Sequence, residues 1–342
     1  MQILVTGGAG YIGSHTCVEL LQAGHEVVIL DNLYNAKEST LARIEKLGGK
    51  AVTFVKGDTR DRACLVRLFQ ECQIDAAIHF AALKAVNESI QIPLPYYENN
   101  VAGTVNLSEV MSEYGCKTLV FSSSATVYGD RNPVPFREDM PVGKATNPYG
   151  TTKIMNEQIL ADLCVSDPEW RVTLLRYFNP VGAHPSGELG EDPNRVPLNI
   201  APIIQDVAMG KRDKLLVTGH DYPTPDGTCI RDYIHIADLA AGHVKALEHM
   251  VASPPGCEVF NLGTGKGTSV LELVEAFECV NGVKIPMEYA PRRAGDIAEC
   301  YADVSKAERV LGWKTQYGID DMCRDVWKWL HNLNREQRER EV

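Results

Sequence analysis

The chain has 342 residues, which is enough for one large domain or two joined domains with a continuous hydrophobic core. Its formal net charge is −11 at pH 7, because 45 acidic side chains outnumber 34 lysines and arginines. A nucleic-acid backbone or an anionic membrane surface is bound through concentrated positive charge. The composition therefore argues against nucleic acid and membrane as main partners and favours a small ligand that is held locally.

The 10 cysteines are scattered along the chain, without a C-x-x-C pair and without a cysteine and histidine cluster at zinc spacing. This distribution predicts reduced thiols and no metal site. No apolar run approaches the roughly 18 residues that a membrane-spanning helix needs, and no basic leader precedes the first apolar strand. We therefore expect a cytoplasmic protein without membrane-spanning segments.

The first predicted element is a short apolar strand at residues 1–6, which runs into glycines and then into a helical pattern through Cys17 and Leu21. Glycines 8, 10 and 13 fit the pattern G-x-G-x-x-G, and glycines 7, 10 and 13 fit the variant G-x-x-G-x-x-G. Glycine allows the backbone to turn tightly and to approach a pyrophosphate, which then lies at the positive end of the following helix. Both patterns predict a dinucleotide-binding turn.

A second predicted strand, residues 26–31, ends in Asp31 at the distance from the glycine turn where a ribose-binding carboxylate belongs. Asp31 would accept hydrogen bonds from the adenosine ribose and would repel a phosphate group on the 2′ oxygen. The sequence therefore predicts NAD rather than NADP as the cofactor.

Two further strand ends fit the same site. Residues 52–55 lead into Asp58, and this carboxylate either meets the adenine or caps the next helix. Residues 76–82 form an apolar run that ends beside Lys84, and its small residues leave room for a flat cofactor. His79, inside this run, is interpreted as a hydrogen-bonded core histidine rather than as a catalyst.

The first half of the chain alternates short Val-, Ile- and Phe-rich runs with helical stretches, as the β-α-β units of a parallel sheet do. Beyond residue 180 the chain becomes rich in Pro, Gly, Asn and Asp. We predict an α/β fold with two parts. Residues 1–180 form a doubly wound, parallel-sheet Rossmann domain that binds NAD, with a return segment near residues 228–262. Residues 181–342 form a smaller, mixed α/β substrate domain.

Tyr149 and Lys153 follow the strand-like run Leu119–Ser124 and are spaced i, i+4, so on a helix they share one face. A free phenol has a pKa of about 10, and each unit removed from it needs about 1.4 kcal/mol of preferential stabilisation of the phenolate. A nearby ammonium supplies part of this stabilisation, and the positive ring of an oxidised nicotinamide supplies more. The pair therefore predicts hydride chemistry on a bound nicotinamide.

Several long stretches of the sequence occur in the same order in one known group of enzymes. They are residues 6–13 (TGGAGYIG), residues 121–129 (FSSSATVYG), residues 147–150 with Lys153, residues 175–183 and residues 231–235. From residue 1 to about 330 the chain resembles the extended short-chain dehydrogenase/reductases, and among them the UDP-glucose 4-epimerases. The resemblance implies an isomerase of galactose metabolism that interconverts UDP-glucose and UDP-galactose at C4 through a transient 4-keto sugar.

The resemblance also implies how the reaction runs. Tyr149, as a phenolate, would remove the proton of the sugar 4-hydroxyl, with Ser124 bridging or shuttling it. Lys153 would hold the nicotinamide ribose and lower the pKa of the tyrosine. NAD would take the C4 hydride and return it to the other face of the keto sugar, so the cofactor would stay bound through turnover.

The positions that match the family's cofactor site are spread over the first 180 residues. They are Gly7, Gly10, Tyr11, Ile12, Gly13, Asp31, Asn32, Asn35, Asp58, Thr59, Phe80, Ala81, Ala82, Lys84, Asn99, Tyr149, Lys153 and Phe178.

The positions that match the family's substrate site extend far into the second half. They are Ser124, Tyr149, Tyr177, Asn179, Asn199, Leu216, Thr218, Arg231, Val270, Arg293, Asp296 and Cys300. The resemblance implies that Arg231 and Arg293 clamp the diphosphate, since guanidinium forks suit phosphate oxygens. Each arginine taken alone fits a surface salt bridge as well. Asp296 would bind the uridine ribose.

Two positions depart from the family pattern. Leu216, Thr218 and Val270 fall where the uracil would be held, and an aromatic residue is common in the place of Thr218. Cys300 lines the sugar pocket, where some relatives carry tyrosine. A bulky ring there excludes a 2-acetamido group, so the small Cys300 implies that UDP-N-acetylglucosamine and UDP-N-acetylgalactosamine are also substrates, unless another side chain closes the pocket.

Two other functions share this fold and cofactor. A nucleotide-sugar 4,6-dehydratase needs an acid pair directly after the Ser-rich strand, where this chain has Ala125 and Thr126. A non-catalytic NAD-sensing protein would keep the glycine turn but lose the reactive groups, whereas Ser124, Tyr149 and Lys153 are all present. The sequence therefore favours the epimerase over both alternatives.

Two helical stretches bear on the oligomeric state. Residues 96–113 and 154–162 carry apolar and small residues at helical spacing. Family analogy implies that these faces form a homodimer interface, although the same faces could pack on the sheet.

Overall fold

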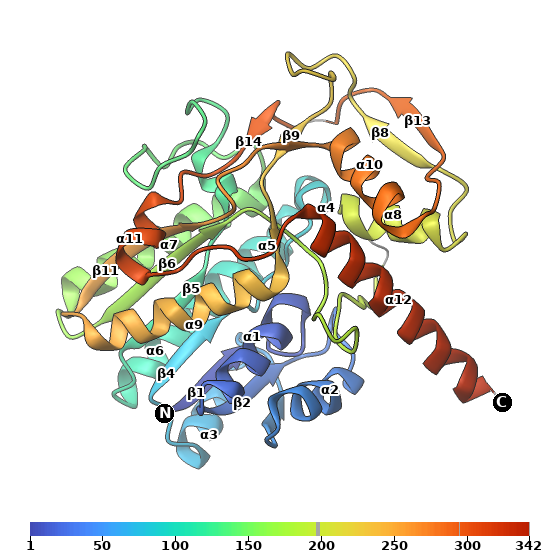
Figure 1. The fold of residues 1–342 in the computed structure, drawn as a ribbon. Helices are drawn as coiled ribbons and strands as arrows, with labels where there is room; N and C mark the ends of the chain where they lie inside the picture. Colours follow the sequence, from blue (N-terminus) through green and yellow to red (C-terminus); the bar gives the residue numbers. More distant parts are fainter. Residues whose placement is uncertain (196–198, 294, 342) are drawn as a thin grey trace.

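The computed structural model describes residues 1–195, 199–293 and 295–341, and its centre is a seven-stranded sheet (Figure 1). The strands are β1 (Gln2–Thr6), β2 (Glu26–Asp31), β3 (Thr53–Lys56), β4 (Ala76–His79), β5 (Thr118–Ser122), β6 (Arg171–Tyr177) and β11 (Gly256–Leu262). Their order across the sheet is β11-β6-β5-β4-β1-β2-β3, and all neighbouring pairs run parallel. Almost every residue of β1, β2 and β4 is buried, as expected for parallel strands that are covered on both faces.

Helices cover both faces of this sheet. One face carries α1 (Tyr11–Gln22), α2 (Ser39–Gly48) and α9 (Ile236–Ala252), and the other carries α3 (Arg62–Glu71), α6 (Gly103–Glu113) and α7 (Pro148–Ser166). Each face has its own hydrophobic core, with Leu20 and Leu247 on the first and Leu68, Leu107 and Leu160 on the second. The predicted doubly wound, parallel-sheet fold is confirmed.

The elements after β6, apart from α9 and β11, form several small sheets and further helices. They are β7 (Asn179–Val181), α8 (Ile200–Ala208), β8 (Leu215–Thr218), β9 (Ile230–Arg231), β10 (Tyr233–His235), β12 (Thr268–Ser269), α10 (Val270–Asn281), β13 (Met287–Ala290), β14 (Glu299–Cys300), α11 (Ser305–Leu311) and α12 (Ile319–Glu341). β7 pairs with β10, β8 with β13, and β9 with both β12 and β14. Ile204, Phe277 and Trp329 belong to the hydrophobic core of this mixed α/β part. Figure 1 shows α12 projecting from the rest of the molecule toward the C-terminus.

Four short elements connect the larger ones near the carboxyl edge of the sheet. They are α4 (Val86–Gln91), α5 (Pro93–Tyr97), the π-helical turn η1 (Glu98–Ala102) and the 3₁₀ turn η2 (Ala125–Tyr128). No helix in the described part of the chain is both long and apolar enough to cross a membrane.

The chain leaves β1 and β4 toward opposite faces of the sheet. α1, which follows β1, packs with α2 and α9, whereas α6, which follows β4, packs with α3 and α7 on the other side. β1 and β4 are nevertheless neighbours in the sheet. Such a reversal opens a crevice at the carboxyl ends of the two strands, which is where ligands bind in doubly wound folds.

A buried polar network fixes α7 to the sheet. Glu157 of α7 accepts hydrogen bonds from Nε and Nη2 of Arg176 at 2.9 and 2.6 Å, and from the hydroxyl of Ser123 at 2.5 Å. Arg176 lies in β6 and Ser123 directly follows β5, so the network joins α7 to two strands. The side chains of Glu157 and Arg176 are only 6% and 4% exposed. Because water does not reach them, each charge is compensated mainly by the opposite charge of its partner.

Removing one partner of this pair leaves the other charge buried without compensation. We expect Glu157→Gln to lower the free energy of unfolding by about 3–5 kcal/mol in urea unfolding. The control is the double variant Glu157→Leu/Arg176→Met, which removes both charges and recovers most of the loss. If the single variant is as stable as the wild type, the pair does not hold α7 in place.

Candidate active site

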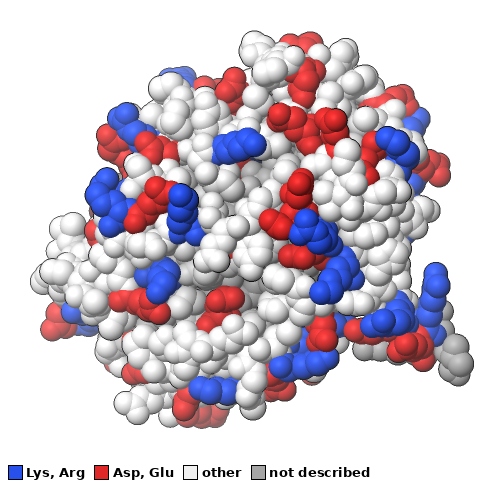
Figure 2. Space-filling model, in the orientation of Figure 1, with Lys and Arg blue, Asp and Glu red and all other residues white. Residues whose placement is uncertain are grey.

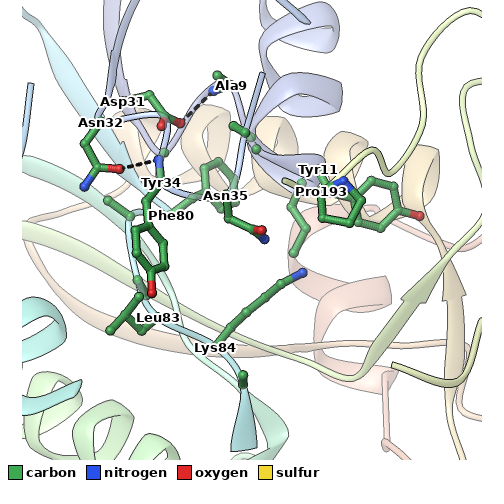
Figure 3. A pocket seen from close by; sticks show the side chains of 18 of the residues that line it. Ala9, Tyr11, Asp31, Asn32, Tyr34, Asn35, Phe80, Leu83, Lys84 and Pro193 are labelled. Atoms are coloured by element: carbon green, nitrogen blue, oxygen red, sulfur yellow. Dashed lines mark hydrogen bonds between the residues drawn. The ribbon is translucent and has the colours of Figure 1, made fainter. Parts of the chain in front are cut away.

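A cavity of about 690 Å³ opens at the carboxyl ends of β1, β2 and β4. Figure 3 shows this cavity from close by. Every residue predicted for the cofactor site lines it, with the exception of Phe178. Phe178 is buried in a separate hydrophobic cluster with Tyr128 and Phe136.

The glycine turn between β1 and α1 is closed by contacts that leave no room for side chains. A Cβ atom on Gly13 would lie 2.3 Å from the carbonyl oxygen of Gly7, and Gly7 itself has φ +70°. Gly10 caps α1 in an extended conformation without a side-chain hydrogen bond to the helix. The first N–H groups of α1 therefore face the cavity without a capping side chain, in the arrangement that binds phosphate oxygens.

Asp31, at the end of β2, is held from both sides by backbone N–H groups. Its Oδ2 accepts from the N–H of Ala9 at 3.1 Å and its Oδ1 from the N–H of Leu33 at 2.8 Å. Burial raises the pKa of Asp31, and these two hydrogen bonds oppose that rise. Each oxygen keeps lone pairs for a further donor, so the carboxylate can accept hydrogen bonds from a ribose.

Asp58 lies after β3 in a tight charged turn. Its carboxylate accepts from the N–H and the guanidinium of Arg60 and from the side chain of Asn32. The hydrogen bond from the Arg60 side chain is the main cause that lowers the pKa of Asp58 to about 2. The cap of α3 is Asp61, which accepts from the N–H of Cys64, so the reading of Asp58 as the helix cap is wrong.

His79 is a core residue, as the sequence indicates. Its Nδ1 lies 2.6 Å from the hydroxyl of Thr6 and its Nε2 lies 3.0 Å from the hydroxyl of Thr104. Burial lowers its pKa to about 3, so the ring is neutral at physiological pH. Asn99 lines the cavity from η1, a π-helical turn of the kind that often occurs at functional sites.

The first turns of α7 bring Tyr149 and Lys153 to the cavity. Asn147 caps the helix by accepting from the N–H of Gly150 at 2.8 Å, and Pro148 occupies the first helical position. The side chain of Lys153 donates to the carbonyl of Ser122 at 2.5 Å, and its Nζ lies 5.8 Å from the centroid of the Tyr149 ring. Tyr149 and Lys153 are 7% and 3% exposed, so the pair is almost fully removed from bulk water.

Burial makes both members of this pair resist charge. It raises the pKa of Tyr149 to about 12, against a hydrogen bond with Ser124 that lowers it. It lowers the pKa of Lys153 to about 7, against the charge of Glu157 that raises it. The expectation that Lys153 lowers the pKa of the phenol stays a prediction.

Ser124 follows β5 at the start of η2. Its Oγ accepts from the N–H of Thr126 at 3.3 Å and from the hydroxyl of the same residue at 3.1 Å. The Ser124 hydroxyl hydrogen remains available, because both of these contacts use the oxygen as the acceptor.

The predicted diphosphate and uridine-ribose residues lie together beyond this cavity. Asp296 accepts from Nε of Arg293 at 3.0 Å, and its other oxygen lies 3.8 Å from Nη2 of Arg231. One carboxylate thus joins two guanidinium groups that come from different parts of the chain. Arg231 is also next to Cys300, its partner in the pairing of β9 with β14.

The other predicted substrate residues are spread over several elements. Tyr177 and Asn199 line the cavity, Asn179 begins β7, Leu216 and Thr218 lie in β8, and Val270 begins α10. Leu216 is 52% exposed, and Cys300 is half-buried beside the cluster that contains Phe178.

Some lining residues carry no local signal in the sequence. They include Tyr34, Arg60, Ser122 and the stretch Gly190, Glu191, Asp192, Pro193 and Arg195. The stretch near residue 190 reaches the cavity from beyond β7, so only the folded chain reveals its position. In the described residues, no group of three or more His, Cys, Asp or Glu side chains is arranged to hold a metal ion.

Comparisons with known proteins give a consistent result. The family model described as GDP-mannose 4,6 dehydratase matches residues 4–326. A UDP-glucose 4-epimerase of Bacillus subtilis is 58% identical over 329 residues, which cover 96% of each chain. The crystal structure of a UDP-glucose 4-epimerase from Bifidobacterium longum in complex with NAD+ and UDP has a TM-score of 0.95 at 51% identity, covering 97% of this chain and 98% of that one. The UDP-Glc/GlcNAc 4-epimerase of Campylobacter jejuni has a TM-score of 0.82 at 39% identity, covering 96% and 98%.

The contact between Gly13 and Gly7 predicts the effect of a single methyl group. Gly13→Ala places a Cβ against the Gly7 carbonyl and must open the turn, so the purified protein should lose its bound NAD. The measurement is the amount of nucleotide released by acid from a known amount of protein. The control is Gly143→Ala, because a Cβ at Gly143 has no neighbour closer than 3.9 Å. Full NAD occupancy in Gly13→Ala would show that the turn does not hold the cofactor.

Proposed function

The chain belongs to the family of UDP-glucose 4-epimerases, and from this premise we propose that the cavity of Figure 3 holds NAD while Tyr149, Ser124 and Lys153 carry out the proton transfers. The protein is an NAD-dependent isomerase that inverts C4 of UDP-hexoses. The observation that carries the proposal is the position of the buried Tyr149 and Lys153 pair on the wall of a cavity that the predicted dinucleotide residues line.

The residues at the adenosine end fit NAD. The backbone of the turn from Gly7 to Gly13 leaves space for a pyrophosphate, and Asp31 keeps lone pairs for ribose hydroxyls. A negative charge at Asp31 disfavours a 2′-phosphate. When bound, NAD supplies an acceptor that takes the C4 hydride and gives it back, together with a positive ring charge near the phenol.

The proton chemistry belongs to three side chains. Tyr149 takes the proton of the sugar 4-hydroxyl and later returns it, and Ser124, whose side chain lowers the pKa of Tyr149, relays it. In its protonated form, Lys153 places an ammonium 5.8 Å from the centroid of the Tyr149 ring and favours the phenolate in the transition state. The sugar passes through a 4-keto form that must turn without leaving, so its UDP part has to stay anchored.

The anchor that we assign to UDP is the group around Asp296. Arg231 and Arg293 supply two guanidinium groups for the diphosphate, and Asp296 holds them near one another. Leu216, Thr218 and Val270 provide the surface for the uracil. These elements all follow β6, which supports the division into an NAD-binding part and a substrate-binding part.

Dehydration is the competing reaction of this fold. It needs an acid pair directly after the Ser-rich strand to expel the 6-hydroxyl, but this chain has Ala125 there and a Thr126 whose hydroxyl donates to Ser124. Purified protein that isomerises UDP-galactose without added NAD is an epimerase rather than a dehydratase or an NAD sensor.

We expect Tyr149→Phe to lower kcat by roughly 10²–10⁴, because the variant keeps the ring and loses the general base. Bound NAD should stay at the wild-type level, since the phenol is not the main contact for the dinucleotide. The matched control is Tyr114→Phe, which alters a tyrosine that is 39% exposed at the end of α6 and does not line the cavity. Steady-state turnover of UDP-galactose measures both variants, and equal rates for all three proteins would rule out Tyr149 as the base.

We also propose that the enzyme accepts the N-acetylated sugar pair. Cys300 is small and half-buried in β14, next to Arg231 in the register, so it sits beside the anchor that would position the sugar. A relative of similar structure, from Campylobacter jejuni, is described as a UDP-Glc/GlcNAc 4-epimerase.

Cys300→Tyr should lower turnover of UDP-N-acetylglucosamine at least about tenfold more than turnover of UDP-glucose, because the ring fills the space of the acetamido group. Cys300→Ala is the control and should keep both activities. An equal loss of both activities in Cys300→Tyr, or a wild type that does not turn over the N-acetyl sugar, would end the proposal.

The enzyme is proposed to be a cytoplasmic homodimer. In the predicted stretch 96–113, Leu107, Val110 and Met111 are buried in the core on the sheet, so these side chains are not available for an interface. The interface that we propose instead uses exposed apolar side chains on neighbouring helices: Ile90 of α4 is 46% exposed, Leu94 of α5 77%, and Met155 of α7, in the predicted stretch 154–162, 39%. The ten cysteines are all free, which suits a reducing compartment.

Charges placed in this apolar group should separate the subunits. We expect Leu94→Glu/Met155→Glu to sediment as a monomer, because two carboxylates per subunit cannot be buried without partners. Val251→Glu is the control, since Val251 is 44% exposed on α9, which covers the opposite face of the sheet. A dimeric double variant, or a monomeric wild type, would refute this interface.

A further inference from the structure

The outer wall of the cavity is formed by a part of the chain that contains no strand-end motif. Residues 187–195, which we call the crossing segment, follow β7 and pass across the cavity that is built from the first strands. Five of its residues line the cavity: Gly190, Glu191, Asp192, Pro193 and Arg195. In the view of Figure 3, the side chain of Lys84 extends toward the part of the cavity where Tyr11 and Pro193 are drawn.

On its inner side the crossing segment is bonded to the loop between β2 and α2. Asp192 forms an ion pair with Lys37 at 2.5 Å. The side chain of Asn194 donates to the carbonyl of Ala36 at 2.7 Å, and to that of Leu33 at 3.3 Å. This loop directly follows Asp31, the residue that fits the adenosine ribose.

The same segment is bonded to the other rim of the cavity. Glu191 forms an ion pair at 3.3 Å with Lys84, which lies in the segment that follows β4. Arg195 forms an ion pair with Glu88 of α4 at 2.8 Å, and its guanidinium lies 4.9 Å from the centroid of the Tyr34 ring. The crossing segment therefore spans the cavity from the end of β2 to the region after β4.

The C-terminal helix α12 supports the segment from outside. The indole of Trp329 donates to the carbonyl of Glu191 at 3.3 Å, and Asn332 donates to the carbonyl of Gly187 at 2.8 Å. A Cβ on Gly190 would lie 2.5 Å from the Trp329 ring, so the backbone lies directly on the indole. These contacts prevent the segment from moving outward unless α12 moves too.

The charges on the segment have a consequence for a diphosphate. Two adjacent acids, Glu191 and Asp192, on the wall of the site would repel the negative pyrophosphate of NAD if they were unpaired. Their pairing with Lys84 and Lys37 removes this repulsion. It also fastens the segment on both sides of the ligand space.

We propose that the crossing segment is part of the cofactor site and that its ion pairs to Lys37, Lys84 and Glu88 slow the release of NAD. The inference rests on the proposed function, since it assumes that NAD occupies this cavity. It assigns to the second half of the chain a direct part in holding a cofactor that the first half binds. It also explains how the cofactor stays in place while the keto sugar turns.

The test measures how fast NAD leaves the purified protein. The NAD-loaded enzyme is diluted into buffer with an NAD-consuming enzyme, so that released NAD cannot rebind, and the NAD that remains bound is followed over time. We expect Asp192→Asn and Arg195→Gln each to release NAD about two to five times faster than the wild type, as the loss of a partly exposed ion pair implies. Arg195→Lys should restore most of the retention. Salt at 0.5 M should speed release from the wild type more than from the variants, because these pairs are screened.

The control variant is Lys214→Gln, which removes an exposed ion pair with Glu288 between β8 and β13, away from the cavity. Its release rate should equal that of the wild type. Its turnover per molecule of bound NAD should also equal that of the wild type.

The possible failures can be told apart. Wild-type protein that holds no NAD after purification contradicts the proposed function itself. Wild-type protein that holds NAD, with release rates from Asp192→Asn and Arg195→Gln equal to those of the wild type and of Lys214→Gln, overturns only the role of the crossing segment.

Discussion

The structure depends on the burial of a phenol and an ammonium side by side at the edge of a parallel sheet. Tyr149 and Lys153 both lie in the first turns of α7, and α7 is held on the sheet by the buried pair of Glu157 and Arg176. Burial drives the pKa of Tyr149 up and that of Lys153 down, so each resists its charged form. Another positive charge in the same space would favour proton transfer from a sugar hydroxyl to this phenol. An oxidised nicotinamide has that charge.

The return of the hydride explains why the cofactor has to be a fixed component of the enzyme. A hydride that leaves the sugar must come back to the same carbon, so neither the cofactor nor the sugar intermediate can be exchanged between the two steps. The chain meets the first condition with a cavity that is formed by the ends of β1, β2 and β4 and crossed by residues 187–195. We propose that it meets the second with a separate group of arginines around Asp296, which would hold the diphosphate while the sugar turns. The surface in Figure 2 carries acidic and basic side chains interspersed, consistent with a small ligand as the main partner.

Much of this arrangement could be predicted from the sequence, because its signals are local. The glycine turn, the acid at the end of β2 and the spacing of Tyr149 and Lys153 each depend on residues that are close in the chain, and the β-α-β rhythm predicts a parallel sheet. Features that depend on distant contacts were missed. Lys153 donates to the backbone carbonyl of Ser122, and a backbone acceptor cannot be recognised from the residue type. Asp61 rather than Asp58 caps α3, because its side chain accepts from the N–H of Cys64. The crossing segment is held at the cavity by contacts with α12 and by ion pairs to residues far away in the chain.

The most direct test of the central claim follows the hydrogen at C4. UDP-glucose labelled with deuterium at C4 is incubated in ordinary water with the purified protein and no added NAD, and the UDP-galactose formed is analysed by mass spectrometry and NMR. If one captive cofactor takes and returns the hydride, the deuterium stays at C4 of the product. Replacement of the label by hydrogen from water, or the need for added NAD, would contradict the account.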